Sequence, residues 1–311
     1  MTIERASVRI VGKPWGCTDL HPWSTIDPAG AKIGELWFER ADTTALATDL
    51  LLKLLFTREP LSIQVHPDDA VARAMGMEHG KTEAWYVLAA APGARIALGL
   101  KRRLTEAGLQ AAIENGSISD EVEWRGVLRE DAILVPAGTI HAIGAGLVIA
   151  EIQQRSDTTF RLFDQGRHRE LHADLAVAAA HAGPADPQAL PKRLTAARTL
   201  LVASPCFVLE RIELPPRSVW DLHAEHETWV LALSGEARIG STRAAIGDAV
   251  YLDAADTGIE AGPEGLTGLV AYLGPEVDPE LMRDRSGQDG GVPNDKFSAP
   301  LGNNVTLEVR S

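Results

Sequence analysis

Short strand-like runs, separated by Gly, Pro and Asp, occupy most of this chain and constrain its fold more than any other feature. The first set of runs lies at 35–40, 61–66, 83–89, 94–100, 131–136, 147–153 and 158–163. The pattern restarts at 199–203, 206–214, 218–223, 228–233, 236–240, 248–253, 258–261 and 267–273. Helical spacing is found at 68–77, 104–115 and 170–182. The sequence therefore predicts a mainly β fold with a few helices inserted between strands.

Two parts of the chain echo each other. Glu-Ala-Trp-Tyr-Val-Leu at 83–88 is echoed by Glu-Thr-Trp-Val-Leu-Ala at 227–232, and Asp-Ala-Ile-Leu-Val at 131–135 by Asp-Ala-Val-Tyr-Leu at 248–252. A Gly-containing turn and a strand lie between the two words in each copy, as in a jelly-roll barrel of the cupin type. We therefore predict two tandem barrels.

The Pro-rich segment between the two strand sets marks the predicted boundary. Residues 1–182 are assigned to an N-terminal barrel that carries the helical insertions, and 183–192 to a linker. Residues 193–311 are assigned to a degenerate C-terminal barrel. Its tail is predicted as a loop at 284–304 followed by a last strand at 305–309.

Metal-ligand side chains occur in three separated strand-like pieces of the first half. Gln64 and His66 are two residues apart and so point to the same side of a strand, Glu83 opens another run, and His141 follows a turn. Two imidazoles, one carboxylate and one amide oxygen suit a divalent ion. The sequence predicts one metal site in the N-terminal barrel.

Composition excludes several classes of partner. The 311 residues carry a formal net charge of −13, which argues against nucleic acid. The chain lacks an apolar run of membrane-spanning length and a visible secretory signal, and it has only two cysteines, so we expect a cytoplasmic protein that does not enter a membrane.

Four stretches occur in the order of one known family: IGELW at 33–37, LSIQVHPDD at 61–69, GKTEAWYVL at 80–88 and VPAGTIHAIGAGLVIAEIQQRSDTTFRLFD at 135–164. Together they resemble type I mannose-6-phosphate isomerase in its short bacterial form. The resemblance is dense over about residues 12–170 and loose beyond. It implies tandem cupin barrels, one zinc ion per chain, and interconversion of mannose 6-phosphate and fructose 6-phosphate. The ligand types alone would also admit manganese, iron, cobalt or nickel.

The resemblance also suggests which residues act on the sugar. Lys81, Asp157 and Arg161 match polar positions of the family's motifs. Asp157 and Arg161, four apart in a strand-like run, are expected to share a face. Lys81 is a candidate base if burial lowers its pKa, and Arg161 a candidate for charge neutralisation. A phosphorylated hexose needs positive charge, for which Arg155 and Arg167 are further candidates; Glu35 and Lys53 are interpreted as supporting residues.

Several alternatives stay open at this level. The chain could be a cupin isomerase or oxygenase for another small molecule, or a non-catalytic sugar-binding cupin. His223 and His226 precede the second copy of the repeat, but no histidine there matches His141, so the second barrel is expected to be metal-free. The sequence leaves open which residue moves the proton, and whether the protein is a monomer or a homodimer.

Overall fold

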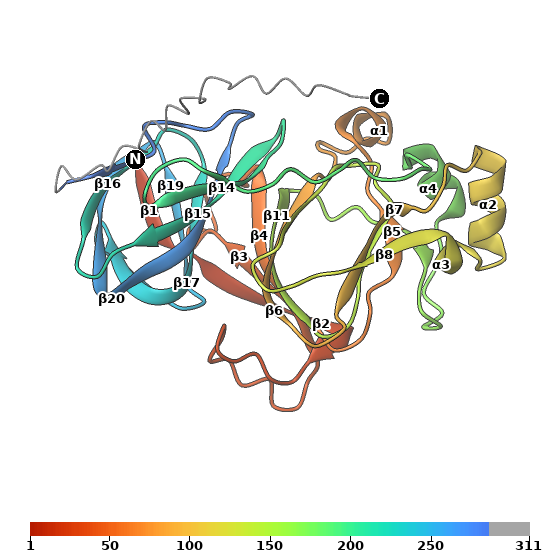
Figure 1. Cartoon of the computed structure of the whole chain (residues 1–311), viewed down its shortest axis with the longest axis horizontal. Helices are drawn as coiled ribbons and strands as arrows, with labels where there is room; N and C mark the ends of the chain where they lie inside the picture. Colours follow the sequence, from red (N-terminus) through yellow and green to blue (C-terminus); the bar gives the residue numbers. More distant parts are fainter. Residues whose placement is uncertain (286–311) are drawn as a thin grey trace, which may run out of the picture.

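The structure is a computed structural model that describes residues 1–285. The predicted strand at 305–309 and nearly all of the loop predicted at 284–304 lie outside the described residues. The chain is mainly β and forms two barrels side by side, as Figure 1 shows, with the N-terminal half at the right and the C-terminal half at the left. Among residues 1–285, no helix is long and apolar enough to cross a membrane.

Two antiparallel sheets form the N-terminal barrel. The six-stranded sheet runs in the order β2 (Ser7–Cys17), β3 (Ile33–Glu39), β4 (Leu50–Thr57), β11 (Leu147–Gln154), β6 (Glu83–Ala90) and β9 (Ala132–Val135). The five-stranded sheet runs in the order β12 (Phe160–Phe163), β5 (Ile63–Val65), β10 (His141–Ile143), β7 (Arg95–Leu100) and β8 (Val122–Gly126). This is the two-sheet jelly-roll arrangement that the sequence predicts.

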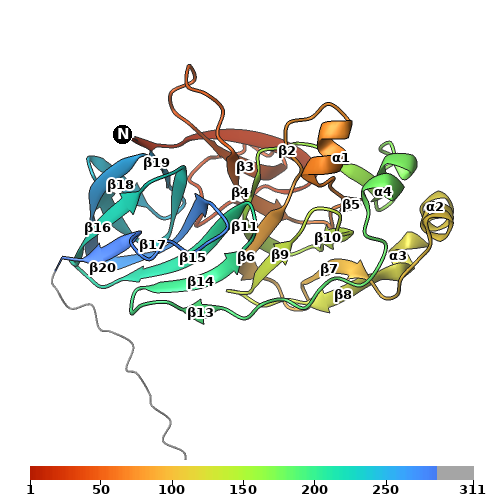
Figure 2. The same cartoon turned by 90° about the horizontal axis from the view of Figure 1, so that it is seen from above.

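Among the described residues the helices all lie before the predicted linker: α1 (Asp69–Ala74), α2 (Glu106–Glu114), α3 (Ile118–Glu121) and α4 (Ala173–Ala179). Helices α1 and α2 begin with side-chain N-caps: the Asp68 side chain accepts from the Val71 amide, and the Thr105 side chain accepts from the Gly108 amide. Helices α2 and α4 pack on the five-stranded sheet at the far end of the molecule (Figure 2). Helix α4 is shorter than the predicted 170–182, because the preceding residues bond to strand β12 instead.

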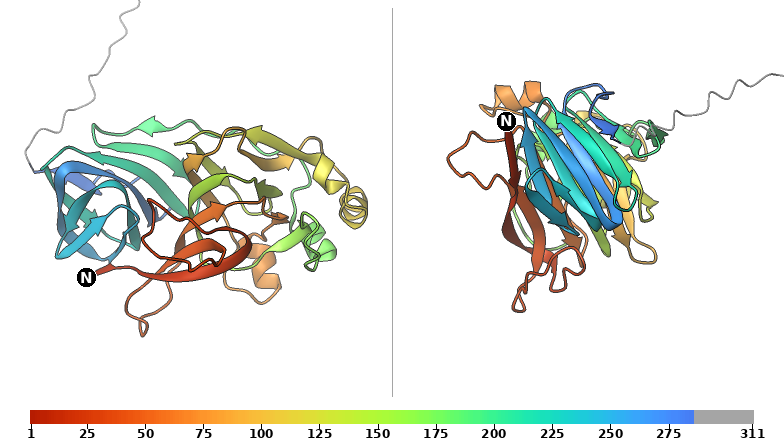
Figure 3. Two further views of the ribbon diagram at one scale, coloured as in Figure 1. Left: turned by 90° about the horizontal axis from the view of Figure 1, so that it is seen from below. Right: turned by 90° about the vertical axis from the view of Figure 1, so that its left-hand side faces the viewer.

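One curled ten-stranded sheet forms the C-terminal barrel. Its main path is β1 (Thr2–Arg5), β19 (Ala249–Asp253), β17 (Thr228–Ile239), β20 (Ala255–Leu273), β15 (Phe207–Leu214), β14 (Arg198–Ala203) and β13 (Lys192–Arg193). Strands β16 (Val219–Ala224), β18 (Thr242–Ala245) and β21 (Met282–Asp284) branch from it. The first strand of the chain thus pairs with the barrel of the other half (Figure 3).

The predicted breaks within two C-terminal strands are wrong. The runs 228–233 and 236–240 form one strand, β17, and 258–261 and 267–273 form one strand, β20. The register between β17 and β20 shifts at the position of the predicted break in β17, so that strand continues. Gly235 takes a positive φ of 71° within it. A glycine in a strand-like run here marks a bulge rather than a turn.

Strand β4 was missed from the sequence, although it lies at the centre of the molecule. Its residues, Leu-Leu-Leu-Lys-Leu-Leu-Phe-Thr, are all buried. Leu52, Leu54 and Phe56 belong to an apolar cluster that also contains Trp229 and Leu231 of the C-terminal barrel, so this face of the six-stranded sheet joins the barrels. The other face, with Lys53 and Leu55, lines the interior of the N-terminal barrel. A strand covered on both sides loses the alternation that reveals half-buried strands.

Candidate metal centre and substrate pocket

Three predicted ligands meet inside the N-terminal barrel. His66 follows β5 and His141 begins β10, both in the five-stranded sheet, whereas Glu83 begins β6 in the six-stranded sheet. Their candidate ligand atoms all lie within 4.8 Å of one another, and each residue is 1% exposed. The group therefore joins the two sheets of the barrel, and it forms only because the barrel closes.

Backbone carbonyls fix both imidazole rings. His66 Nδ1 lies 2.8 Å from the carbonyl of Thr158, and His141 Nδ1 lies 2.9 Å from the carbonyl of Thr139. Because a carbonyl can only accept, each Nδ1 carries the proton and each Nε2 presents a lone pair. The two Nε2 atoms lie 3.2 and 3.7 Å from the oxygens of Glu83. Such outer contacts are what orient metal-binding histidines.

The charges of the group also suit a metal ion. Burial, aided by Lys81, lowers the pKa of His66 to about 3, and burial lowers the pKa of His141. For Glu83, burial alone would raise the pKa, but the ammonium of Lys81 holds it well below its usual value. The imidazoles are therefore neutral and the carboxylate ionised. Both Glu83 oxygens are buried; Lys81 Nζ lies 2.7 Å from Oε1, whereas Oε2 has no hydrogen-bond partner, so a metal ion would satisfy it.

Gln64 lies beside this group. Its Nε2 is 3.2 Å from His141 Nε2, and its Oε1 accepts from Ser62 Oγ at 3.2 Å. Strand β5 pairs Gln64 with His141 on one side and with Arg161 on the other. Residues directly opposite each other point to the same side of a sheet. The predicted fourth ligand therefore has its amide nitrogen, rather than its oxygen, toward His141; turning the amide by 180° would exchange the two atoms.

A polar pocket of about 270 Å³ opens beside the metal group. The predicted residues Lys81, Asp157 and Arg161 all line it. Its other charged or amide side chains are Lys13, Glu35, Lys53, Gln64, Glu83, Glu151 and Arg169. Neither Arg155 nor Arg167 lines this pocket. Arg155 donates to Thr48, whereas Arg167 bonds to the Pro60 carbonyl and pairs with Asp164, so local contacts hold both away from it.

Two expectations about the pocket residues are wrong. Burial lowers the pKa of Lys81, but Glu83, whose Oε1 lies 2.7 Å from Nζ, and Glu151 outweigh this, so the pKa is raised and the ammonium stays charged. Asp157 and Arg161 do not share a strand face, because β12 begins at Phe160 and Asp157 lies exposed in the loop before it. The loop, rather than the strand period, brings Asp157 to the pocket.

Arg161 presents positive charge that the protein leaves uncompensated. One of its Nη atoms donates to the Glu170 carbonyl at 2.7 Å, while its Nε is buried without a partner. Burial and the neighbouring Arg169 keep its pKa below the usual value. Among residues 1–285, no carboxylate forms an ion pair with Arg161, whereas Arg169 is paired with Asp164. Two adjacent guanidinium groups with one nearby carboxylate favour an anionic ligand.

Sequence reasoning missed Lys13, Glu151 and Arg169. Glu151 is 4% exposed, and its Oε2 lies 3.3 Å from Lys53 Nζ on the neighbouring strand. Lys13 pairs with Glu35 at 3.2 Å. The signal for Glu151 and Lys53 was present in the sequence, because each interrupts an otherwise apolar run. A charged side chain in such a buried strand needs either an ion-pair partner or a bound ligand.

The histidines of the C-terminal barrel lie elsewhere. His223 is exposed on β16 and contacts Asp256, and His226 is exposed before β17. Within the described part of the chain, His66, Glu83 and His141 form the one group of three or more such side chains that could hold a metal ion.

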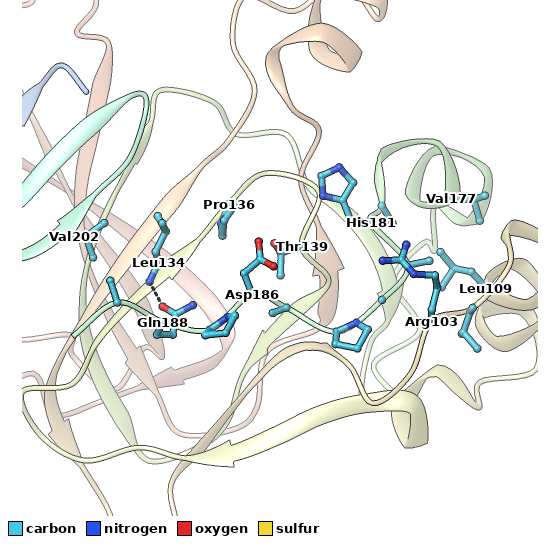
Figure 4. Close-up of a pocket in the computed structure, with 18 of the residues that line it drawn as sticks. Arg103, Leu109, Leu134, Pro136, Thr139, Val177, His181, Asp186, Gln188 and Val202 are labelled. Atoms are coloured by element: carbon cyan, nitrogen blue, oxygen red, sulfur yellow. Dashed lines mark hydrogen bonds between the residues drawn. The ribbon is translucent and has the colours of Figure 1, made fainter. Parts of the chain in front are cut away.

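Figure 4 draws another hollow, of about 1100 Å³, which shares no lining residue with the pocket beside Glu83. The predicted linker crosses it, and Gln188 accepts from the Leu134 amide at 2.7 Å. His181 and Asp186 also line it. No group of metal ligands has been found there among the described residues, and the smaller pocket beside Glu83 is therefore the candidate site.

Comparison with known proteins gives the family of the chain. The chain is 35% identical to a mannose-6-phosphate isomerase of Streptococcus mutans over 224 residues, which cover 68% of this chain and 70% of that protein. The chain belongs to the mannose-6-phosphate isomerase family. Mannose-6-phosphate isomerase ManA of Bacillus subtilis is 41% identical over 136 residues, 40% of this chain and 41% of that protein. No family model matches the sequence.

Solved structures show the same fold. The mannose 6-phosphate isomerase of Bacillus subtilis superposes with a TM-score of 0.76 at 23% identity, covering 88% of this chain and all of that one. A putative mannosephosphate isomerase of Archaeoglobus fulgidus gives a TM-score of 0.69 at 16% identity, covering 88% and 97%. The cupin fold expected from the sequence is thus confirmed.

Proposed function

We propose that this protein is a metal-dependent aldose–ketose isomerase that interconverts mannose 6-phosphate and fructose 6-phosphate. The observation that carries the proposal is the buried His66–Glu83–His141 group at the edge of a pocket lined by lysine and arginine. The relatives reported above bear isomerase names, which supports this function over the oxygenase and sugar-binding alternatives. The cytoplasmic location and the oligomeric state stay predictions.

The phosphate is assigned to the guanidinium groups of Arg161 and Arg169. An acidic protein needs a local positive site for an anionic sugar, and Arg161 has a buried Nε with no hydrogen-bond partner. A planar guanidinium can bind two phosphate oxygens at once. Arg161 lies opposite Gln64 on the neighbouring strand, which orients a phosphorylated substrate relative to the metal group.

The metal is assigned to His66, Glu83 and His141, with Gln64 as a fourth donor. Zinc is the ion expected from the family resemblance, and the nitrogen and oxygen donors also suit manganese, iron, cobalt or nickel. When bound, a divalent ion polarises sugar oxygens and stabilises negative charge on them. Lys81, whose ammonium remains charged beside Glu83, would add positive charge on the same side of the pocket.

Isomerisation requires a group that takes a proton from the carbon next to the carbonyl and returns it to the neighbouring carbon. We assign this task to a pocket carboxylate. Asp157, the candidate from the sequence, lines the pocket from a loop. Glu151 is the second candidate: burial and Glu83 raise its pKa, which makes its carboxylate a stronger base. Lys81 is less suited, because its pKa is raised.

The test is an isomerase assay with mannose 6-phosphate, made on purified protein before chelation, after chelation and after zinc is restored. We expect fructose 6-phosphate to form, activity to disappear with the metal, and zinc to restore it. If metal analysis finds no bound metal and the protein is still fully active, the proposed metal dependence is wrong. Absence of turnover in metal-replete, folded protein would overturn the substrate assignment.

A further inference from the structure

The sequence contains the word Glu-x-Trp three times, at 35–37, 83–85 and 227–229. The three words lie in or at the start of strands β3, β6 and β17. Residues two apart on a strand point to the same face, so each indole N–H can reach the carboxylate two residues before it. The three words therefore form a natural comparison within one chain.

Two of the three indoles make this local bond. Trp37 Nε1 donates to Glu35 Oε2 at 2.5 Å, and Trp229 Nε1 donates to Glu227 Oε1 at 2.8 Å. Trp85 differs: its Nε1 donates to Glu151 Oε1 at 3.0 Å, across to strand β11. Glu83 is consequently the one carboxylate of the three that has no hydrogen bond from its own tryptophan; Lys81 Nζ lies 2.7 Å from its Oε1, and its Oε2 has no hydrogen-bond partner.

The register of the six-stranded sheet explains the difference. Glu151 stands directly opposite Trp85 in the β11–β6 pair and directly opposite Lys53 in the β11–β4 pair. The carboxylate is held from both sides, because Lys53 Nζ lies 3.3 Å from its other oxygen. A buried carboxylate next to an indole accepts the N–H hydrogen bond that would otherwise go to the glutamate two residues before the tryptophan.

The indole also contacts the metal group. Trp85 is 0% exposed, and its ring meets the ring of His141 edge-on, with 5.5 Å between centroids. Trp85 is not among the residues that line the pocket, whereas Glu151 is. Any effect of the indole N–H on substrate therefore passes through Glu151.

We propose that Trp85 is a positioning residue. Its N–H holds the carboxylate of Glu151 on the pocket wall, and its bond to Glu151 instead of Glu83 leaves the Glu83 carboxylate without an indole donor that would compete with a metal ion. The consequence for turnover rests on the proposed isomerase function. The hydrogen bond and the metal content can be measured without it.

The first test compares Trp85→Phe with Trp229→Phe. Both variants keep a buried aromatic ring and remove one indole-to-carboxylate hydrogen bond, but only the first removes it from the pocket wall. We expect Trp85→Phe to keep its metal and its KM within about threefold, while kcat falls by about tenfold or more, roughly 1.4 kcal/mol. Trp229→Phe should lower the midpoint of thermal unfolding and leave kcat unchanged. Equal kcat in the two variants, or loss of metal from Trp85→Phe, would overturn the proposal.

The second test uses Glu151→Gln, in which the amide oxygen can still accept from the indole but the charge is gone. If Trp85 acts through Glu151, adding Trp85→Phe to Glu151→Gln should lower kcat little further, so the two effects are not additive. Fully additive effects would contradict a shared action.

A third measurement does not depend on activity. The Trp85 indole N–H resonance in a ¹H–¹⁵N spectrum should move upfield in Glu151→Gln, because the neutral amide is a weaker acceptor, while the Trp229 resonance stays in place. An unmoved Trp85 resonance would overturn the proposal even if Trp85→Phe fails to fold. If the parent protein proves inactive on mannose 6-phosphate, the proposed function fails, and the spectrum and the metal content still decide this inference.

Discussion

The two barrels bury carboxylates in opposite ways. In the C-terminal barrel Glu210 is 0% exposed and both its oxygens are bonded: Arg198 donates to them at 2.8 and 2.7 Å, and the Tyr272 hydroxyl donates to Oε1 at 2.7 Å. In the N-terminal barrel Glu83 is 1% exposed; its Oε1 has only the Lys81 ammonium at 2.7 Å as an ion-pair partner at hydrogen-bond distance, and its Oε2 has no hydrogen-bond partner. A fully bonded buried carboxylate supports the fold, whereas one with an unbonded oxygen is costly unless a ligand satisfies that oxygen.

The internal repeat makes the contrast sharper. Glu227 is the counterpart of Glu83, yet it accepts from the backbone amides of Asp49 and Leu50 at 2.6 and 3.0 Å as well as from Trp229. Those amides precede and begin strand β4 of the N-terminal barrel. The same position in the two copies thus holds a candidate metal ligand in one barrel and a link between the barrels in the other.

The largest expected effect comes from removing a metal ligand. His141→Ala should abolish most metal binding and lower kcat/KM by about a thousandfold or more, roughly 4 kcal/mol, because the remaining donors cannot hold the ion. Metal analysis and the isomerase assay measure this. Stoichiometric metal in the folded variant would remove His141 from the site and with it the contrast between the barrels.

Next in size is a change of stability in the C-terminal barrel. Arg198→Met leaves Glu210 buried without its cation, and we expect the free energy of unfolding to fall by about 3–5 kcal/mol. Urea denaturation measures the loss. The protein that remains folded should keep its metal and its kcat. A loss below about 1 kcal/mol would show that this ion pair does not support the barrel.

A smaller effect is expected at the cationic side of the N-terminal pocket. Arg161→Lys keeps the charge but loses the planar group that binds two oxygens, so kcat/KM should fall by about a hundredfold, roughly 2.7 kcal/mol, with metal retained. Steady-state kinetics with mannose 6-phosphate provide the measurement. Kinetics like those of the parent would exclude Arg161 from substrate binding and leave Arg169 and Lys81 as candidates.

The smallest effect is expected from the histidines of the C-terminal barrel. The double variant His223→Ala, His226→Ala changes two exposed side chains far from the metal group in sequence, and kcat and metal content should match the parent. Metal analysis and steady-state kinetics check this. A tenfold loss of turnover, about 1.4 kcal/mol, would mean that the second barrel takes part in the chemistry and that the contrast is wrong.

Much of the fold could be predicted from the sequence, because the signals for strands are local. The runs at 83–89 and 147–153 match β6 and β11 within one residue, and the helical spacing at 104–115 matches α2, whose C-cap is Asn115. Strand β4 was not readable, because burial on both faces gives a continuous apolar run without a period. Strand β2 was missed as well: it is an edge strand, exposed over much of its length.

The candidate site, like the fold, was predicted from the sequence only in part. Residue types and their spacing predicted that His66, Glu83 and His141 belong together, and the structure brings their ligand atoms within 4.8 Å. The strand period failed for Asp157, because a loop turns the chain before Arg161. Lys13, Glu151 and Arg169 were missed, since each carries a charge whose partner lies on another strand or loop.

The sequence by itself determined the β character, the tandem repeat and the residue types of the metal group, because strand period and ligand chemistry depend on near neighbours. Only the tertiary structure decided which carboxylate each indole bonds and which charges stay unpaired. Three copies of Glu-x-Trp offer the same local hydrogen bond, and cross-strand register diverts one of them to Glu151. Register is set by distant parts of the chain, which is why the word alone cannot show that Glu83 lacks a hydrogen bond from its own tryptophan.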